Sequence, residues 1–385
     1  MLDEILEKRM SEIKDAGLLR TLRILRSKPA PVIGIEGKQY INFSSNNYLD
    51  LAGDKEISAV AAEAAEKYGC GGTSSRLIGG SLEIHERLEN ALAEFKNKQA
   101  SLVFPSGYQA NTGVISALCD KSAKGKSCII MDRLSHASLW DGAKLAGSRI
   151  FVFGHCDMNS FEAVLKRAGS YDMKLAVTES VFSMDGDITP LKDFAFLCRK
   201  YNAVSMVDEA HSTGVFGKEG RGHCEMSGAG GEIDIITSTL SKAFGAQGGF
   251  VCSSRKLVDF LINKSRSFIY TTAVSPILCA AALKALELVK KADGKRHKLA
   301  ELSSYLLEKL KSAGYDSGNS ASQIVPLITG SIENTVKVSE TLFKNGIFAP
   351  SVKFPTVPEG RARIRISLTA GHSYEDIEKL FKSGI

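Results

Sequence analysis

Seven short apolar runs between residues 101 and 252 constrain the fold of this chain more than any other feature of the sequence. They are rich in Val, Ile, Leu and Phe, and amphipathic stretches separate most of them: SLVF, SCIIM, RIFVFG, KLAVTES, NAVSMVDEA, IDIIT and GGFVC. Strands that alternate with helices in this way form a mostly parallel sheet with helices on both faces. The pattern therefore predicts a large α/β domain built on a seven-stranded sheet.

The pattern changes after residue 272. Two long helical stretches, 276–292 and 297–314, are followed by a strand-like run, a helix over 333–346, the run ARIRISLTA and a short final helix. This order predicts a smaller α+β domain. We expect an N-terminal helix and short strands over residues 1–45, a large α/β domain over 46–280 and a small α+β domain over 281–385.

Composition excludes several classes of protein. The chain has 385 residues, 44% of them hydrophobic, and no apolar run long enough to span a membrane. The net charge is only +6, and the aromatic residues do not interleave with Arg or Lys, so nucleic acid is not expected as a partner. Acidic residues in the N-terminal helix argue against a signal peptide. The eight cysteines show no metal spacing, which predicts reduced thiols, a cytoplasmic protein and no metal site.

The segment VDEAHSTG places Asp208 and His211 just past the end of a predicted buried strand. The carboxyl edge of a parallel sheet is where ligands bind in such folds. The letters DEAH also occur on the magnesium-binding strand of helicases, but the chain has no G-x-x-x-x-G-K-[ST] phosphate loop and no G-x-G-x-x-G dinucleotide motif. The alternative to a binding site is that Asp208 caps a loop and His211 is simply buried.

Three other strand ends carry polar residues. In FPSGYQAN, Gly107 and Tyr108 begin a helix whose free N–H groups suit a phosphate, although strand-glycine-helix junctions are common. In DRLSHASL, His136 starts a helix and could be only its cap. In TESVFSMDGD, Glu179 and Ser183 follow a strand, and the Asp-Gly pair there is also an ordinary turn.

The stretch TSTLSKAFGAQGG, residues 237–249, contains one lysine, Lys242, between small residues and glycines. Lys242 could be an ordinary surface lysine or a buried nucleophilic amine. A phosphate cradle, a carboxylate, histidines and a lysine at one sheet edge together meet the needs of pyridoxal phosphate, which requires a lysine to bind its aldehyde and a carboxylate on its ring nitrogen.

The chain resembles the α-oxoamine synthases, which are pyridoxal-phosphate enzymes of the aspartate-aminotransferase fold (fold type I). The resemblance rests on the segments above and on four others: NFSSNNYLDL, GTSSRLIGGSLEIHERLENALAEFKN, YTTAVSP and RARIRISLTAGH. The resemblance runs from about residue 40 to the C-terminus. It implies catalytic roles for Lys242, Asp208 and His136, with Lys242 binding the cofactor, Asp208 pairing with its ring nitrogen and His136 stacking on its ring. The other implied contacts are His211 and Ser183 at the phenolic oxygen, and Gly107, Tyr108 and Thr239 at the phosphate.

The resemblance also implies substrate contacts and a partner. Arg363 matches the arginine that holds the amino-acid carboxylate, and Asn47 and Glu179 match active-site positions. Thr271 and Thr272 match residues that reach the phosphate of a neighbouring subunit, which implies a homodimer with shared active sites. Arg20, expected in the N-terminal helix, is a candidate for the distal carboxylate of the acyl chain, with Arg23 and Arg26 as alternatives and a solvated helix face as another.

The implied reaction is a decarboxylative condensation of an amino acid with an acyl thioester. FSSNNYL, SSRLIGG and FSMDGD are most similar to the members that join L-alanine to a pimeloyl thioester in biotin synthesis. A serine palmitoyltransferase-like or 2-amino-3-ketobutyrate ligase-like enzyme, using serine or glycine, is the alternative, and a non-enzymatic partner subunit is a further one. Asp50 departs from the family, which has glycine there, and it leaves the substrate assignment open.

Overall fold

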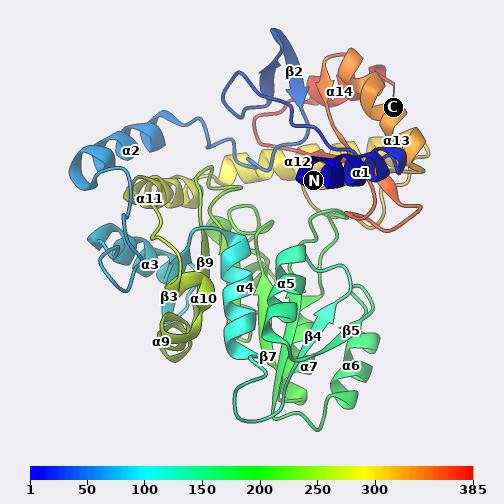
Figure 1. The fold of residues 1–385 in the computed structure, drawn as a ribbon. Coiled ribbons are helices and arrows are strands. Elements are labelled where there is room, and N and C mark those ends of the chain that lie inside the picture. The colour runs from blue at the N-terminus through cyan, green and yellow to red at the C-terminus, as the bar shows by residue number, and fades with distance from the viewer. Residues whose placement is uncertain (385) are drawn as a thin grey trace.

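The computed structural model describes residues 1–384 and contains the predicted sheet (Figure 1). Each of the seven predicted runs forms a strand, in the spatial order β3-β9-β8-β7-β6-β4-β5. β9 runs antiparallel to both of its neighbours, and the other neighbouring pairs are parallel. The mostly parallel sheet is therefore confirmed. Its strands are β3 (Ala100–Phe104), β4 (Ser127–Asp132), β5 (Arg149–Phe153), β6 (Met173–Glu179), β7 (Val204–Asp208), β8 (Ile235–Thr239) and β9 (Gly249–Ser253).

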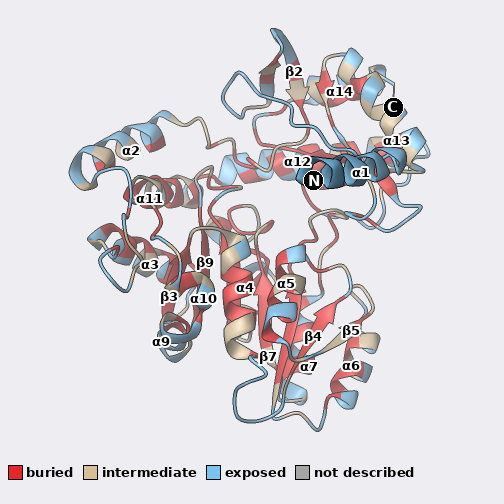
Figure 2. Cartoon of the chain, viewed as in Figure 1, coloured by how far each residue is buried: buried red, intermediate tan, exposed pale blue. Residues whose placement is uncertain are grey.

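Helices cover both faces of this sheet because its strands are apolar on both sides. Successive side chains of a strand point to opposite faces. In β4, Ile129 and Met131 pack with one helix layer, whereas Cys128 and Ile130 pack with the other. Figure 2 shows the central strands as largely buried. The first layer contains α4 (Gly107–Leu118), α5 (Ala137–Ala146), α9 (Arg255–Lys264) and α10 (Arg266–Ile269), and the second contains α6 (Met158–Arg167), α7 (Leu191–Lys200) and α8 (His223–Met226).

The C-terminal part forms a smaller α+β unit, as predicted. Strand β13 lies between β10 and β12 in one three-stranded sheet. In a second sheet, β2 lies between β1 and β11, so strands from the two ends of the chain share a sheet. The elements are β1 (Val32–Ile35), β2 (Lys38–Asn42), β10 (Ile324–Gly330), β11 (Ile347–Phe348), β12 (Ser351–Val352), β13 (Ala362–Ser367), α12 (Asp293–Ser312), α13 (Ile332–Lys344) and α14 (Tyr374–Lys382).

A third group of helices joins the two parts: α2 (Lys55–Tyr68), α3 (Glu83–Phe95) and α11 (Pro276–Lys290), with the short η1 (Lys218–Gly220) nearby. Their apolar faces share one core cluster with β10, β13 and α12. The boundaries at residues 45 and 280 stay a prediction. The pairing of β2 with β11 nevertheless places strands of the first and third predicted ranges in one sheet.

The N-terminal helix α1 (Leu2–Asp15) forms as expected, but none of its residues is buried (Figure 2). It ends at Asp15, so Arg20 lies outside the helix in a segment without regular secondary structure, contrary to the sequence-based expectation. Among the described residues, no helix is both long and apolar enough to cross a bilayer.

Candidate active site

Three neighbouring strands end at the carboxyl edge of the large sheet. Glu179 at the end of β6 lies opposite Asp208 at the end of β7, and Asp208 lies opposite Thr237 in β8. These strands enclose one end of a cavity of about 210 Å³. It is lined by Ser106, Gly107, Tyr108, Asn111, His136, Ser138, Glu179, Asp208, Ala210, His211, Ser238, Thr239, Ser241 and Lys242. A larger cavity of about 580 Å³ beside α12 contains none of the predicted site residues.

Asp208 is buried and held from two sides. Its Oδ1 accepts a hydrogen bond from the backbone N–H of Ala210 at 2.8 Å, and its Oδ2 accepts one from Nδ2 of Asn111 at 2.7 Å. Asn111 lies one turn into α4, so this bond connects the ends of β7 and α4. The Oδ1 atom of Asn111 is buried and has no hydrogen-bond partner among residues 1–384. Buried polar atoms are normally paired, so this orphaned acceptor beside Asp208 fits a bound polar ligand.

Lys242 is the end of a short chain of polar contacts. Its Nζ lies 2.8 Å from Nε2 of His211, and Nδ1 of His211 lies 2.6 Å from the hydroxyl of Tyr48. Burial lowers the pKa of Lys242 to about 8, against the opposing negative charges of Asp208 and Glu179. Burial and the charges of Lys242 and Arg365 hold the pKa of His211 well below its ordinary value. A neutral histidine thus contacts an amine that loses its proton near pH 8.

This lowered pKa predicts how the cofactor-free protein takes up pyridoxal phosphate. Only the neutral amine attacks an aldehyde. An ordinary lysine has a pKa of 10.5 and is therefore almost fully protonated at pH 8. The rate of covalent attachment is therefore expected to rise with pH and to reach half its maximum near pH 8. Stopped-flow absorbance from about pH 6 to about pH 10 measures this rate. A rate that is still climbing at the upper end of that range would contradict the lowered pKa.

His136 caps α5 and faces the cavity. Its Nδ1 accepts from the backbone N–H of Ser138 at 3.2 Å, so the capping alternative is correct, but the residue also lines the cavity. The backbone N–H of His136 donates to Oε1 of Glu179 at 2.6 Å. Burial and the charge of Asp208 raise the pKa of Glu179 well above its ordinary value. Burial lowers the pKa of His136, which favours a neutral ring over the cavity.

The N-terminus of α4 forms an anion cradle. The first intrahelical bond runs from the N–H of Ala110 to the carbonyl of Ser106, so the N–H groups of Gly107 and Tyr108 precede the hydrogen-bonded turns. Thr239 lines the same end, with its hydroxyl 2.8 Å from the carbonyl of Gly248. A Cβ on Gly249 would lie 2.4 Å from the nitrogen of Gly107. Glycine at position 249 therefore lets the helix start pack directly against β9.

The contacts of the two arginines of β13 do not match the expectation that Arg363 holds the substrate carboxylate. Arg363 is only 1% exposed, and its guanidinium donates to the carbonyls of Arg361 and Met184 and to the carboxylate of Asp185. It does not line the cavity. Arg365 lies two residues further along the same face and donates to the Asn46 side chain at 3.1 Å. Arg365 does not line the cavity either, and its guanidinium also donates to the carbonyl of Ser183 and to the hydroxyl of Ser367. Its charge nevertheless lowers the pKa of Lys242 and of His211, so it lies near enough to act on the site.

Five other predicted residues lie apart from the cavity lining: Ser183, Asn47, Arg20, Thr271 and Thr272. The carbonyl of Ser183 accepts from Arg365, and its hydroxyl is half-buried. All hydrogen bonds that the side-chain amide of Asn47 can form are already made. Its Oδ1 accepts from the N–H groups of Leu51 and Ala52, and its Nδ2 donates to the carbonyl of Pro29 and the carboxylate of Asp50. In this conformation Asn47 shapes a turn and has no hydrogen bond left for a substrate.

Arg20 is exposed and donates to the hydroxyl of Thr356 at 3.4 Å. Thr271 is half-buried and Thr272 is exposed, both next to Tyr270. These positions lie at the surface of the single chain.

The residues present fit pyridoxal phosphate. An amine of lowered pKa, a buried carboxylate, a ring that faces the cavity and a helix N-terminus surround one cavity, and the orphaned Oδ1 of Asn111 lies there too. Sequence reasoning missed Asn111, Tyr48 and Arg365. Asn111 lies within the segment FPSGYQAN, one helical turn past Gly107, which is a usable signal. Arg365 has the same strand face as Arg363, so the sequence does not distinguish the two.

Comparison with known proteins identifies the family. Residues 38–383 match the family described as aminotransferase class I and II. The chain belongs to the aminotransferase class I and II family. The seven-stranded sheet and the smaller C-terminal unit are the fold type I architecture expected for this family.

Individual members of the aminotransferase class I and II family are similar over nearly the full chain. A protein of Thermoanaerobacter pseudethanolicus named 8-amino-7-oxononanoate synthase is 42% identical over 99% of this chain and 95% of its own length. One of the same name from Symbiobacterium thermophilum is 41% identical over 98% and 96%. The structure of a variant of serine palmitoyltransferase from S. paucimobilis, with a bound PLP–myriocin aldimine, superposes with a TM-score of 0.92 at 31% identity, over 98% and 95% of the two chains.

Proposed function

We propose that this protein is a pyridoxal-phosphate-dependent acyltransferase. It condenses L-alanine with a pimeloyl thioester, either pimeloyl-CoA or a pimeloyl carrier protein, and forms 8-amino-7-oxononanoate, carbon dioxide and a free thiol in biotin synthesis. The relatives above 40% identity carry the name of that synthase. The observation that supports an enzyme most strongly is Lys242, whose amine has a pKa of about 8 inside a cavity that also contains Asp208. The free cysteines fit a cytoplasmic protein.

When bound, pyridoxal phosphate supplies an electron-accepting ring conjugated to the α-carbon of the amino acid. Lys242 removes the α-proton at Nζ, because its lowered pKa of about 8 leaves a larger fraction of neutral amine than an ordinary lysine has at the same pH. His211 and Tyr48 hold that amine in place. Asp208 keeps a fixed negative charge at the end of β7, and Asn111 orients its carboxylate.

Other residues bind and orient. The first turn of α4 binds the phosphate, and His136 covers one side of the cavity. Arg365, with its charge directed at Lys242 and His211, anchors the carboxylate of the amino acid in place of the expected Arg363. Ser183 and Asn47 then act through loop geometry, since Ser183 orients Arg365 and Asn47 shapes the turn after Asn46.

The role of Arg365 predicts a binding defect. Arg365→Lys is expected to raise the KM for alanine about 10- to 100-fold, because a two-pronged charged hydrogen bond to the carboxylate is lost. Arg363→Lys is the matched control, because Arg363 lies on the same strand face but is bonded to Asp185. This variant should lower the melting temperature and leave the KM for alanine nearly unchanged. Steady-state kinetics and thermal melts of both variants measure this difference. A KM increase confined to Arg363→Lys would restore the original assignment.

A serine palmitoyltransferase-like activity is the second candidate, because the superposition with that enzyme is close. The deciding experiment supplies the purified protein with pyridoxal phosphate, one amino acid and one acyl-CoA, and follows release of free thiol. Alanine with pimeloyl-CoA should give the fastest release. Faster release from serine with palmitoyl-CoA, or from glycine with a short acyl-CoA, would change the substrates and keep the enzyme class.

The proposed enzyme is a homodimer with shared active sites. Thr271 and Thr272 adjoin an exposed apolar surface, on which Ile78 is 85% and Tyr270 is 71% exposed. The N–H of Ala273 donates to the carbonyl of Ser74, so the loop carrying Ile78 packs along this segment. A second copy that covers this surface would bring Thr272 to its neighbour's cradle and bury these side chains.

Shared sites predict complementation between two inactive variants. Lys242→Ala and Thr272→Ala place their defects in different subunits of one hybrid site, so a mixed dimer regains one intact site. Refolded or co-expressed mixtures should therefore exceed the activity of either variant alone. Activity of the mixture equal to the average of the two variants would show that both residues serve the site of their own subunit.

A further inference from the structure

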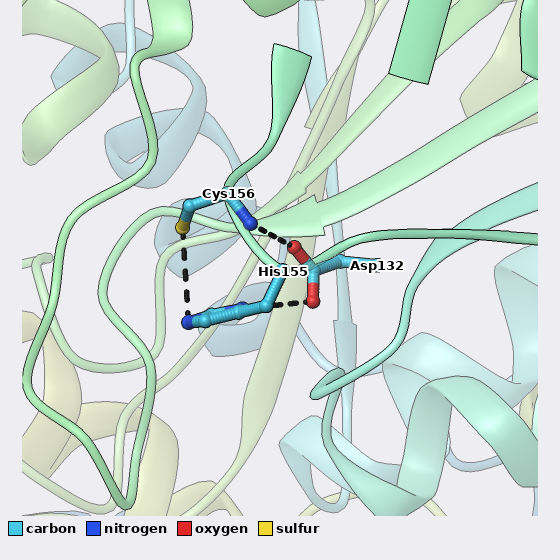
Figure 3. Close-up of side chains that lie close together, drawn as sticks. All are labelled: Asp132, His155 and Cys156. Carbon is cyan, nitrogen blue, oxygen red and sulfur yellow. Dashed lines mark hydrogen bonds and ion pairs between the residues drawn. The ribbon is translucent and has the colours of Figure 1, made fainter. Parts of the chain in front are cut away.

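His155 lies between two carboxylates, and none of these three residues lines the cavity. It follows β5, and its Nδ1 lies 2.9 Å from Oδ1 of Asp132 while its Nε2 lies 2.6 Å from Oδ2 of Asp187. Figure 3 shows the ring against Asp132, with Cys156 beside it. Ionised carboxylates only accept hydrogen bonds, so a ring bonded to two of them carries a proton on each nitrogen. Phe182 packs edge-on against the ring at 4.3 Å and fixes its plane.

Each carboxylate belongs to a loop that carries active-site residues. Asp132 ends β4, and it also accepts from the N–H groups of Leu134 and Cys156. The turn from Asp132 to Ser135 leads directly to His136. Asp132 is fully buried. It therefore determines how the chain enters the loop that places His136 at the cavity.

Asp187 closes the other loop, residues 182–187. Its carbonyl accepts from the N–H of Phe182, and Val181 pairs with Ile188 at the base. Within this loop, the carbonyls of Ser183 and Met184 accept from Arg365 and Arg363. The loop thus holds the two arginines of β13 from the side opposite the strand.

The surroundings favour a permanent cation over a metal ion. The ligand atoms of Asp132, His155 and Cys156 lie within 4.8 Å of one another, but both ring nitrogens already have carboxylate partners. The charged or titratable groups that face the ring are Asp132, Asp187 and the thiol of Cys156, 3.9 Å from Nε2. Burial alone would lower the pKa of His155, but the hydrogen bonds to Asp132 and Asp187 outweigh it and raise the pKa to about 12.

We propose that His155 is a positioning residue of the reaction: as a permanent imidazolium between Asp132 and Asp187, it holds the loop that leads to His136 and the arginine-binding loop, residues 182–187, at a constant separation. The cation neutralises one of two neighbouring carboxylates and supplies a donor to each loop. Loss of the cation leaves two carboxylates facing each other, and the loops move apart. The kinetic part of this inference rests on the proposed function, whereas the charge state of His155 does not.

The charge state is tested without any reaction. Protein labelled with nitrogen-15 in histidine is examined by NMR with and without pyridoxal phosphate, up to about pH 9, where ordinary histidines are neutral. One histidine should keep both ring nitrogens protonated, and its signal should vanish in His155→Gln. A neutral His155 at that pH would overturn the proposal. So would one equivalent of zinc in the purified protein, since a metal-bound nitrogen cannot hold a proton.

The positioning role is tested with matched variants. In His155→Gln, the KM for the accepted amino acid and the dissociation constant for pyridoxal phosphate should each rise about 10- to 100-fold. Both constants are measured at a temperature well below the melting temperature of the variant. His155→Lys, which keeps the charge, should recover most of this loss. Asp187→Asn, which frees only one side, should give a smaller rise and serves if His155→Gln does not fold. Glu162→Gln breaks a cluster of ion pairs between α6 and α7, formed with Lys166 and Lys200 and outside both loops, and should leave the KM unchanged.

The outcomes separate the two proposals. A lower melting temperature with the KM and cofactor affinity unchanged in His155→Gln would show a merely structural role and overturn the inference. If no tested amino acid and acyl-CoA release thiol, the proposed function fails. The cofactor affinity and the NMR signal of His155 still decide the positioning role in that case.

Discussion

Lys242→Ala is expected to lower kcat by at least about 1,000-fold, the loss typical of removing a general base. The variant should still bind pyridoxal phosphate, because Gly107, Tyr108 and Thr239 do not depend on the amine. Binding should become non-covalent, so that dialysis removes the cofactor and reduction no longer attaches it to the chain. Mass spectrometry after reduction, together with thiol-release kinetics, measures both effects.

Chemical rescue distinguishes lost chemistry from lost structure in this variant. A small primary amine added to Lys242→Ala should restore part of the activity, because it can occupy the space of the side chain and accept the α-proton. Lys256→Ala, an exposed lysine on α9, is the control and should behave like the unmodified protein. Retention of more than about a tenth of the activity in Lys242→Ala would remove the lysine from its proposed role.

Asp208→Asn is expected to slow loss of the α-proton by about 100- to 1,000-fold, because the site no longer holds a negative charge at the end of β7. The substitution is nearly isosteric: the oxygen of the new amide can still accept from the N–H of Ala210, and its NH2 group can donate to Oδ1 of Asn111 once that side-chain amide turns over. The fold and the covalent link to Lys242 should therefore persist. Exchange of the α-proton of alanine for deuterium, followed by proton NMR, isolates this step.

The control for this prediction is Asp193→Asn, which removes an exposed carboxylate from α7. It should leave the exchange rate unchanged. Exchange at the unmodified rate in Asp208→Asn would mean that the carboxylate does not stabilise the reacting centre, and the loop-capping alternative for Asp208 would then stand.

Local pattern alone determined the seven strands and the residues at their carboxyl ends. Apolar runs of strand length between amphipathic stretches lie along the sequence, and a parallel sheet brings their ends to one edge. For that reason the sequence is sufficient to place Glu179, Asp208, Thr239 and Lys242 together, and all four line the cavity. The capping role of His136 is also legible in the sequence, because a helix start depends on neighbouring residues.

Tertiary structure decided what depends on contacts between distant segments. Arg363 and Arg365 share a strand face. Only the loop packed against them determines that Arg363 pairs with Asp185, whereas the charge of Arg365 acts on Lys242. Tyr48 reaches His211 across 163 residues, and His155 connects two loops that no motif links. Periodicity specifies the elements because it is a property of neighbours, whereas the direction and charge of a buried side chain are set by whatever the fold packs around it.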